Sequence, residues 1–548
     1  MTNREIAAQF NLLSKLIELH GESSFKSRSY TNAYLNIKKS PKQLSEMNAA
    51  EMHDMKGIGK AIQAKIQELL QTGEMQTLNR YLDKTPVGVQ ELLSIKGFGP
   101  KKVKIVWEDL GIESTGELLY AITENRLVVL KGFGAKTQET LKQQLEYHLE
   151  SKGKLLYAIA LPLANELETL LSAQFKNKQT TITGEVARKC DIIEKFTVLT
   201  EADTKSVVQL FQKHEDFVEA DKVWYYKNMG IDIIHSDSKS YNYDLAKANS
   251  DPAFWAAVKI PAGNYGSEEA VFEDNKLPYY IPEYREPENV SSMDSYVGAQ
   301  NVITEDQIRG SIHNHSTYSD GVNTLEEMLD ACMDKSYEYF VITDHSKSAF
   351  YANGLKEPEL MQQLDEIRDL DQKESDIRFF SGIESDILSS GALDYADDVL
   401  AELDVIVASV HSNLKMDEKK ATKRLITAIE NPYTSILGHP SGRLLLSRQG
   451  YPLDYTKIID ACAANGVAIE LNANPNRLDM DWRWIAQAIE KEVLISINPD
   501  AHSIKGLDDM SYGVACARKA GLPTAYCLNA MDVDEFEEWL EEQHGKRR

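Results

Sequence analysis

Six short apolar runs in the C-terminal part of the chain each deliver a metal-ligating side chain at or just after their end. They are "GSIHNHSTYSDG", "YFVITDHS", "RFFSGIESD", "VIVASVHS", "TSILGHPSG" and "VLISINPDAHS". Strand-like and helical patterns alternate after about residue 305, which predicts βα units in a parallel sheet or barrel. In a βα barrel the carboxyl ends of the strands meet on one face, where active sites form. All six histidines between residues 305 and 530 lie at these ends, so the runs predict one polar site.

The side chains at these ends form a set of candidate metal ligands. The set is His313, His315, Asp320, His345, Glu384, His411, His439, Asp500 and His502. Imidazoles and carboxylates without a thiolate favour Mn²⁺, Zn²⁺ or Fe²⁺ over a structural zinc site. The set exceeds what one ion needs, so we expect two or three divalent ions, with Asp320, Glu384 and Asp500 as catalytic carboxylates. Such ions activate water and neutralise phosphoryl charge, which predicts phosphoester hydrolysis. Lys347, Arg443 and Arg477 lie near ligand loops and are candidates to bind the substrate phosphate.

A second pattern recurs three times near the N-terminus, as "MKGIGK" from Met55, "IKGFGPKK" from Ile95 and "LKGFGAK" from Leu130. Two glycines before a helix allow a tight turn whose N–H groups can bind a phosphate at the positive end of the helix dipole. The repeat therefore predicts contacts to a nucleic-acid backbone without sequence reading. The residues expected there are Gly57, Gly59, Lys60, Gly97, Gly99, Lys101, Lys102, Gly132, Gly134 and Lys136.

The charge distribution is consistent with this division of roles. The net charge is −25, but residues 1–150 hold 20 Lys and Arg against 18 Asp and Glu, whereas residues 151–548 hold 40 against 67. A polyanion attracted by bulk charge would therefore bind the N-terminal part. No apolar run approaches the roughly 18–20 residues of a membrane span, and the five cysteines form no CxxC pair. We expect a monomer in the cytoplasm, with no membrane partner.

The C-terminal motifs resemble those of the polymerase and histidinol phosphatase (PHP) family. The matching stretches are "HNHSTYSDG", "TDH", "GIESDI", "SVH", "GHPSGR" and "DAH", and fitting residues fill all of the family's ligand positions. One departure is Pro499, where relatives commonly have Thr before Asp-Ala-His. The resemblance implies a distorted (β/α)7 barrel with a trinuclear metal site.

Along essentially the whole chain, the order of segments is similar to bacterial family X DNA polymerases. The resemblance implies a multidomain fold: α-helical helix-hairpin-helix N-terminal domains, an α+β nucleotidyltransferase-like palm and thumb, and the PHP barrel. The expected segments are a DNA-end-binding domain (1–84), a fingers-like domain (85–150), a degenerate palm (151–225), a thumb-like domain (226–290), a linker (291–304) and the barrel (305–548). The stretch "YYIPEYREPENVSSMDSY" is expected to be extended.

The same resemblance implies roles for particular residues of the first domain. In family X that domain binds a 5′-phosphate at a DNA gap, and "GESSFKSRSY" looks like its binding stretch, with Lys26, Arg28 and Tyr30 at the phosphate-facing positions. Lys65 falls where some relatives carry a Schiff-base lysine with lyase activity. A plain phosphate contact is the alternative role for Lys65.

The polymerase motif is where this sequence departs from family X. That palm uses Gly-Ser, then an Asp-x-Asp strand and a third Asp, to hold two Mg²⁺ ions. The matching stretch "ITGEVARKCDIIEKFTVLT" has Glu185 in place of Ser and Lys195 and Thr197 at the Asp-x-Asp positions, while Asp232 keeps the third position. A lysine puts positive charge where an ion must bind. We expect a palm without polymerase activity that serves as a DNA-holding scaffold.

The combined interpretation is a DNA-repair phosphoesterase. It would act as a 3′-5′ exonuclease or 3′-end-processing enzyme, with cleavage at abasic sites as a further activity. Its substrates would be gapped, nicked or 3′-ended DNA, bound without sequence specificity. Three alternatives stay open: an active gap-filling polymerase, a phosphatase of small phosphomonoesters, and a non-catalytic DNA-end-binding protein. Three backbone-binding turns disfavour the small-molecule phosphatase, and a full ligand set disfavours the non-catalytic protein.

Overall fold

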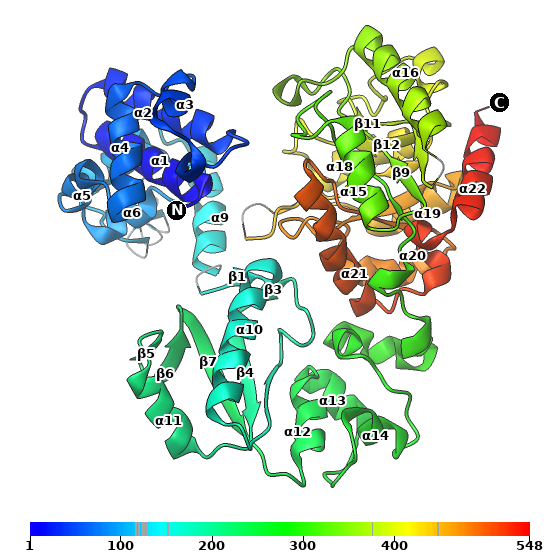
Figure 1. The fold of residues 1–548 in the computed structure, drawn as a ribbon, viewed down its shortest axis with the longest axis horizontal. Coiled ribbons are helices and arrows are strands. Elements are labelled where there is room, and N and C mark those ends of the chain that lie inside the picture. The colour runs from blue at the N-terminus through cyan, green and yellow to red at the C-terminus, as the bar shows by residue number, and fades with distance from the viewer. Residues whose placement is uncertain are drawn as a thin grey trace. The chain divides into compact units, whose positions relative to one another are not determined.

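The computed structural model describes residues 1–115, 118, 121–122, 127, 130, 132–150, 153–374, 376–446 and 449–547. The chain divides into two compact units, Met1–Lys152 and Gly153–Arg548. Figure 1 shows the helices of the first unit in blue to cyan and the second unit in cyan to red. In the described part of the chain, none of the helices has both the length and the apolar character needed to cross a membrane.

The described part of the first unit is helical. Its elements are α1 (Asn3–Leu19), α2 (Ser24–Lys38), η1 (Leu44–Glu46), α3 (Ala49–Asp54), α4 (Lys60–Thr72), α5 (Gln76–Leu82), α6 (Val87–Leu92), α7 (Pro100–Leu110) and α9 (Ala135–Glu150). Helix α1 begins at a capping box between Thr2 and Glu5, and its apolar positions recur at helical spacing, so that Phe10 and Leu13 are buried. One apolar core extends from Ile6 to Leu145 and includes helices on both sides of residue 84.

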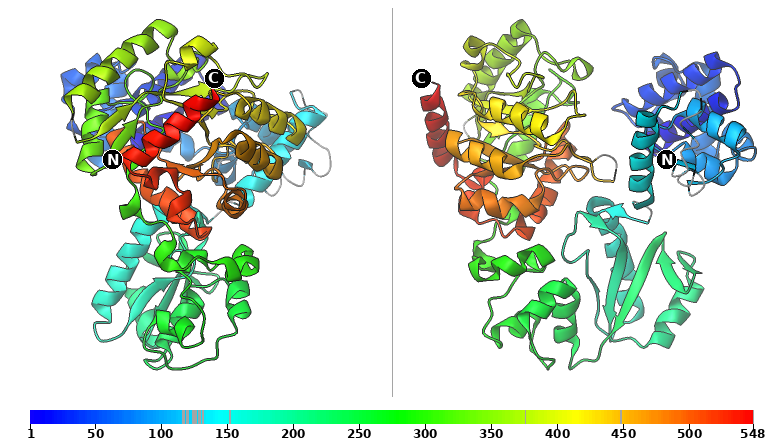
Figure 2. Two further views of the ribbon diagram at one scale, coloured as in Figure 1. Left: turned by 90° about the vertical axis from the view of Figure 1, so that its right-hand side faces the viewer. Right: turned by 180° about the vertical axis from the view of Figure 1, so that it is seen from behind.

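A mixed five-stranded sheet forms the start of the second unit. Its order is β2-β4-β7-β6-β5, with β2 (Thr180–Thr183), β4 (Lys195–Thr200), β5 (Phe217–Ala220), β6 (Val223–Tyr226) and β7 (Met229–His235). β1 (Leu155–Leu156) and β3 (Ile192–Ile193) pair separately. α10 (Tyr157–Gln174) and α11 (Thr204–Lys213) pack on the sheet through a shared core, and Figure 2 shows this sheet from two further sides. β7, which bears Asp232, lies beyond residue 225, where the palm was expected to end.

The segment that follows is compact up to the barrel. It contains α12 (Tyr241–Ala248), α13 (Pro252–Val258), α14 (Glu268–Glu273), η2 (Pro282–Tyr284), η3 (Pro287–Ser295), η4 (Ala299–Asn301) and η5 (Glu305–Gln307). The stretch expected to be extended is instead folded into 3-10 turns. The reason is aromatic packing: the Tyr296 ring lies 4.5 Å from that of Tyr284 and 5.1 Å from that of Tyr280, and both of those residues are buried.

The C-terminal part contains two parallel sheets, β10-β9-β8 and β11-β12-β13-β14-β15. The strands are β8 (Gly310–Ser311), β9 (Tyr339–Val341), β10 (Arg378–Phe380), β11 (Gly382–Asp386), β12 (Val405–Ser409), β13 (Ile436–Leu437), β14 (Ala468–Asn472) and β15 (Ile495–Asn498). Parallel bridges join the two sheets just past the strand ends, at Asn314 with Ala501 and at His345 with Glu384. β8, β9 and β11 to β15 therefore form a closed ring, with β10 outside it beside β9, as predicted for a distorted (β/α)7 barrel.

Helices surround this barrel and cover the outer face of its strands, while the inner face is buried in the barrel interior. They are α15 (Leu325–Asp334), α16 (Glu357–Lys373), α17 (Asp397–Leu400), α18 (Glu418–Ile429), α19 (Tyr455–Asn465), α20 (Ile485–Glu490), α21 (Met510–Lys519) and α22 (Val533–Lys546). Short 3-10 turns lie between them: η6 (Phe350–Ala352), η7 (Trp482–Trp484), η8 (Ile504–Asp509), η9 (Thr524–Tyr526) and η10 (Leu528–Ala530). Every residue of β12 is buried, as expected for an apolar strand inside a βα barrel. The observed architecture confirms the predicted fold class.

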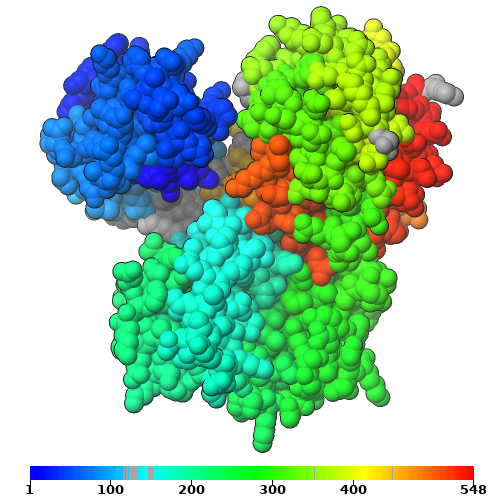
Figure 3. Space-filling view, in the orientation of Figure 1, coloured from blue at the N-terminus to red at the C-terminus, as the bar shows by residue number. Residues whose placement is uncertain are grey.

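The segments of the second unit that precede the barrel contact it, and Figure 3 shows one face of these parts. Charged side chains bridge them: Lys519 Nζ lies 2.6 Å from Glu286 Oε1, and Arg518 Nε lies 3.0 Å from Glu283 Oε1. Glu286 also accepts from Arg188 Nε at 3.1 Å. The barrel, the thumb-like segment with Glu283 and Glu286, and the palm-like part with Arg188 therefore share a buried polar interface.

Candidate metal centre

The carboxyl ends of the parallel strands bring the predicted ligands together at one mouth of the barrel. His313 and His315 follow β8, Asp320 lies in the loop after them, His345 follows β9, Glu384 lies in β11, His411 follows β12, His439 follows β13, and Asp500 and His502 follow β15. Each strand is buried along its length, so the polar residue at its end is presented at the rim of the core.

Glu384 lies at the centre of the cluster. Its Oε1 atom is 3.2 Å from His313 Nε2, 3.1 Å from His411 Nε2 and 2.9 Å from His439 Nε2. Its Oε2 atom is 2.8 Å from His345 Nδ1. Burial raises the pKa of this carboxyl, but the surrounding histidines outweigh burial and hold the pKa well below its ordinary value.

Two further carboxylates extend the cluster. Asp500 Oδ1 lies 3.1 Å from His315 Nε2, and Asp320 Oδ1 lies 3.3 Å from His502 Nε2 and 3.5 Å from His345 Nε2. The described residues include three groups whose ligand atoms lie within 4.8 Å of one another: His315, Asp320, His345 and His502; His313, His315 and Asp500; His345, Glu384 and His411. His315 and His345 each belong to two groups, so neighbouring ions would share ligands.

The chemistry of the buried atoms fits divalent ions. His315 Nδ1 and His439 Nδ1 are buried and have no hydrogen-bond partner among the described residues, and the close contacts of His313 Nε2 and Glu384 Oε2 do not have hydrogen-bond geometry. A buried polar atom without a partner costs about 1–3 kcal/mol, so a cluster of them needs a compensating ligand. Imidazole nitrogens and carboxylate oxygens together are the donors that Mn²⁺, Zn²⁺ and Fe²⁺ accept.

The histidines differ in protonation because their surroundings differ. Burial lowers the pKa of His411, but Glu384 and Asp386 outweigh it and raise that pKa to about 10. Burial also opposes the charged form of His502, while Asp320 and Asp500 raise its pKa to about 9. The neighbouring carboxylates therefore favour the protonated form of both imidazoles.

Three of the ligands adopt backbone conformations that L residues rarely use. The φ angles are 62° at His313, 22° at His439 and 51° at Asp500. Such conformations cost of order 1–3 kcal/mol each and persist where the surroundings impose them, typically at functional sites. At His439 the backbone N–H donates to Glu470 Oε1 at 3.1 Å, which holds this turn in place.

The structure adds supporting carboxylates that the sequence interpretation missed. Glu470 Oε2 lies 2.6 Å from His313 Nδ1, and Asp386 Oδ1 lies 2.5 Å from His411 Nδ1. Each fixes the orientation of a ligand ring through the nitrogen on its other side. A signal for Asp386 was present: it stands two residues after Glu384 on β11, and the strand period of two puts both on one face.

The three candidate phosphate-binding residues lie in different surroundings. Lys347 is partly exposed, 3.3 Å from Glu357 and 5.0 Å above the Tyr395 ring. Arg443 is largely buried and fully engaged by protein groups, including Asp481 at 2.7 Å. Arg477 Nε lies 3.8 Å from Asp500 Oδ2, so this guanidinium is the one beside a candidate ligand.

The Gly-x-Gly turns of the first unit have the predicted geometry. Gly57, Gly97 and Gly132 have φ angles of 78°, 76° and 89°, in the left-handed region that favours glycine. Gly59 and Gly99 are the N-caps of α4 and α7, and neither helix start has a side-chain cap. The helix N-H groups are therefore open to a ligand at these two turns. In the third turn, Gly134 precedes α9 and Lys136 is exposed, whereas Lys131 lies outside the described residues.

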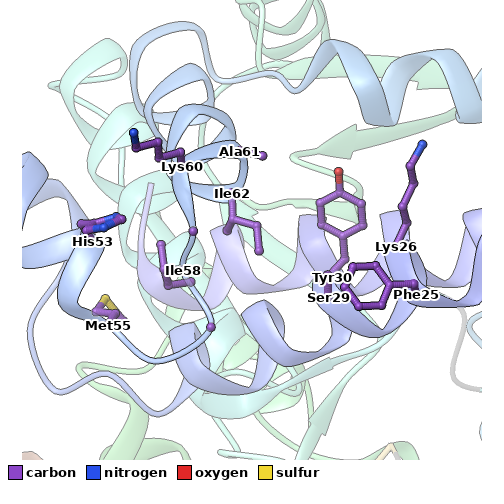
Figure 4. A pocket seen from close by; sticks show the side chains of 12 residues that line it. Phe25, Lys26, Ser29, Tyr30, His53, Met55, Ile58, Lys60, Ala61 and Ile62 are labelled. Carbon is purple, nitrogen blue, oxygen red and sulfur yellow. The ribbon is translucent and has the colours of Figure 1, made fainter.

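A cavity of about 660 Å³ joins the first of these turns to α2. Lys26, Tyr30 and Lys60 line it, and Figure 4 shows the Lys26 ammonium and the Tyr30 hydroxyl pointing the same way, whereas the Lys60 side chain points away from them. Arg28 is exposed and does not line it. Lys65 donates to Thr77 Oγ1 at 2.7 Å and is likewise absent from the lining.

The degenerate palm positions lie together on the five-stranded sheet. Lys195 forms an ion pair with Asp232, and Thr197 is the register partner of Asp232 on the parallel strand β7. Glu185 Oε2 accepts from the backbone N–H of Glu194 at 2.6 Å. The remaining carboxylates at these positions are thus engaged by a lysine and by the backbone.

Comparison with known proteins gives matches over nearly the whole chain. A helix-hairpin-helix domain matches residues 1–75, a SAM-like helix-hairpin-helix tandem matches 89–146, and the PHP domain matches 311–474. The chain is 32% identical over 571 residues to the DNA polymerase/3′-5′ exonuclease PolX of Bacillus subtilis, covering 98% of this chain and 99% of that protein. Probable phosphatases of Thermoanaerobacter sp. and Acetivibrio thermocellus are 28% and 24% identical over 246 residues, covering 43% of this chain.

Proposed function

Because this chain belongs to the family of the DNA polymerase/3′-5′ exonuclease PolX, we propose that it is a metal-dependent DNA phosphoesterase that shortens or cleans 3′ ends during repair. The observation that carries the proposal is the convergence of nine imidazole and carboxylate ligands at the mouth of the PHP barrel. Cleavage at abasic sites would be a further reaction of the same centre.

The residues of the mouth divide the work of hydrolysis. His313, His315, Asp320, His345, Glu384, His411, His439, Asp500 and His502 would hold two or three divalent ions, with Mn²⁺, Zn²⁺ or Fe²⁺ as candidates. When bound, such ions supply a water of lowered pKa and neutralise charge on the phosphoryl group. Arg477, beside Asp500, would orient the substrate phosphate. His502 has a side chain 40% exposed, so substrate would enter past it.

The first unit would hold the DNA without reading its sequence. Uncapped helix starts at Gly59 and Gly99, with Lys60, Lys101 and Lys102 beside them, suit backbone phosphates. The cavity lined by Lys26, Tyr30 and Lys60 would take the 5′-phosphate at a gap. Substrates would then be gapped, nicked or 3′-ended DNA, bound by a monomer in the bacterial cytoplasm.

The palm-like part would no longer polymerise. Lys195 occupies a position where the family holds an ion, and its ammonium neutralises Asp232, so the carboxylates needed for two Mg²⁺ ions are missing. This supports a repair nuclease that keeps the palm for a purpose other than nucleotide addition.

A gel assay tests the proposal directly. A 5′-labelled primer on a gapped template, with Mn²⁺ and all four nucleotides, is incubated with wild type or with His313→Ala. We expect primer shortening by wild type and none by the variant, with DNA binding retained. Extension of the primer, or shortening that survives in His313→Ala, would contradict the proposal.

Phosphatase action on small phosphomonoesters is a second candidate, favoured by one observation. The probable phosphatases match this chain over 43% of its length while covering 95% and 96% of their own. Full-length protein assayed with p-nitrophenyl phosphate and with a gapped DNA primer distinguishes the two. A kcat/KM higher for the small ester would favour the phosphatase.

A further inference from the structure

We propose that the palm-like part completes the hydrolytic site of the barrel. Asp191 of that part would anchor Arg443, and Arg443 would hold the loop that presents Arg477 to the substrate phosphate. The inference rests on the proposed phosphoesterase function and gives the palm a role that does not require polymerase chemistry.

Arg443 fastens two loops of the barrel mouth to each other. It follows the ligand His439 in the loop after β13, and its side chain reaches the loop after β14. There Nε donates to the Arg477 carbonyl at 2.9 Å, Nη2 donates to the Leu478 carbonyl, and Nη1 lies 2.7 Å from Asp481 Oδ2. Because its three nitrogens donate to different groups, this guanidinium fixes the path of the backbone at Arg477 and Leu478.

A carboxylate from outside the barrel completes the surroundings of Arg443. Asp191 Oδ2 lies 3.5 Å from Arg443 Nη2, and the two side chains are only 13% and 15% exposed. The backbone carbonyl of Asp191 accepts a hydrogen bond from the Tyr157 N–H at 3.1 Å. The backbone of this residue is therefore fixed to the start of α10. Removing one partner of such a buried pair leaves the other charge without compensation, which is costly.

Arg477 differs from Arg443 in that two of its guanidinium nitrogens donate no hydrogen bond within the described chain. Its Nε lies 3.8 Å from Asp500 Oδ2, its side chain is 21% exposed, and its Nη1 and Nη2 atoms donate no hydrogen bond within the described chain. A planar guanidinium with two unengaged nitrogens can bind a phosphate through two parallel hydrogen bonds. Arg477 is therefore the substrate contact, and Arg443 and Asp191 are positioning residues.

A double-substitution cycle in the full-length protein tests this chain of contacts. The variants are Asp191→Ala, Arg477→Ala and both together, and Asp232→Asn is the control, because it removes an exposed carboxylate from the same palm-like part. We expect Asp191→Ala and Arg477→Ala each to raise KM for a 3′-ended oligonucleotide about 10-fold with little change in kcat. The double variant should be no worse than Arg477→Ala alone, since both remove the same contact.

A binding measurement makes the test independent of turnover. Thymidine 5′-monophosphate, a product of 3′ trimming, is titrated calorimetrically into each variant with Mn²⁺ present. The inference is supported if the affinity for the nucleotide falls about 10-fold in Asp191→Ala, in Arg477→Ala and in the double variant. Additive losses, or unchanged binding in Asp191→Ala, would overturn it. If Asp191→Ala fails to fold, the isosteric Asp191→Asn carries the same comparison, and Asp191→Glu should restore part of the affinity.

The outcomes separate this inference from the proposed function. If wild-type protein binds the nucleotide but cuts no DNA, the proposed nuclease activity is refuted. The nucleotide affinities of the variants can still be compared in that case. Wild-type protein that cuts DNA with an Asp191→Ala variant of unchanged KM would refute the positioning role and leave the nuclease standing.

Discussion

The ammonium of Lys195 on β4 pairs with the carboxylate of Asp232 on the neighbouring strand β7. A cation thus neutralises the one aspartate found at the positions where the resemblance to family X implies three. We expect purified protein to add no nucleotide to a primer, and Lys195→Ala to shorten 3′ ends at the wild-type rate. Primer extension in a radiolabel assay checks the first point, and template-dependent extension would contradict it.

Glu384→Gln should abolish hydrolysis. The substitution keeps the volume but removes the charge that five histidines surround, and a carboxamide is a poor ligand for these ions. We expect metal content, measured by mass spectrometry of the purified protein, to fall by at least one ion, and activity to fall about 1,000-fold. Glu490→Gln, an exposed change on α20, is the matched control and should alter neither value.

Glu470→Gln should weaken metal binding without abolishing it. Glu470 orients the His313 ring and holds the His439 backbone, and it is not itself one of the candidate ligands. Loss of such a supporting partner typically lowers metal affinity about 10–100-fold. Titration of metal-free protein with Mn²⁺, followed by electron paramagnetic resonance, measures the change. An affinity equal to that of wild type would show that Glu470 has no such role.

Gly99→Asp should weaken DNA binding without harming the fold. Gly99 caps α7 with an ordinary φ of −76°, and an added Cβ would meet no atom within 4 Å. Aspartate is a favoured N-cap, so Tm should hold or rise, while its charge would occupy the helix start that a phosphate needs. We expect affinity for gapped DNA at low salt to fall about 10-fold by fluorescence anisotropy. Ala8→Asp, an exposed residue of α1, adds the same charge outside the Gly-x-Gly turns and should bind like wild type.

Asp509→Asn should stabilise the protein at alkaline pH. Burial, with Asp508 and Asp500 adding to it and Lys505 opposing it, raises the pKa of Asp509 to about 7 from 3.8. A raised folded-state pKa means that the stability this carboxyl provides is fully present below 3.8 and is lost as pH rises through 7. Between pH 5 and 8 wild type should therefore lose about 1–2 kcal/mol relative to Asp509→Asn. Chemical denaturation at both pH values measures this, and parallel pH profiles would contradict it.

The ligands of the metal centre were predictable because each stands at the end of an apolar run, and topology alone brings such ends together. His411 and His439, for example, could be predicted as candidate ligands from the sequence pattern alone. Glu470 was harder, because a carboxylate inside an apolar strand also fits a purely structural role. The Asp191–Arg443 pair could not be foreseen, since 252 residues separate the two and no local pattern links them. The expected extended stretch was wrong because prolines there coexist with tyrosines that pack on one another.

The buried ion pairs between the barrel and the segments before it also determine what a domain deletion would do to the stability of the protein. Lys519 is 2% exposed, and its ammonium bonds to Glu286 of the thumb-like segment and to the Arg188 carbonyl of the palm-like part. Removing one partner of such a pair typically destabilises a protein by about 3–5 kcal/mol. Deleting the segments before the barrel would therefore leave charged side chains of the barrel buried without partners. The stability of the barrel thus depends on the segments that precede it, so the chain behaves as one folding unit from Gly153 onward rather than as a string of separable modules.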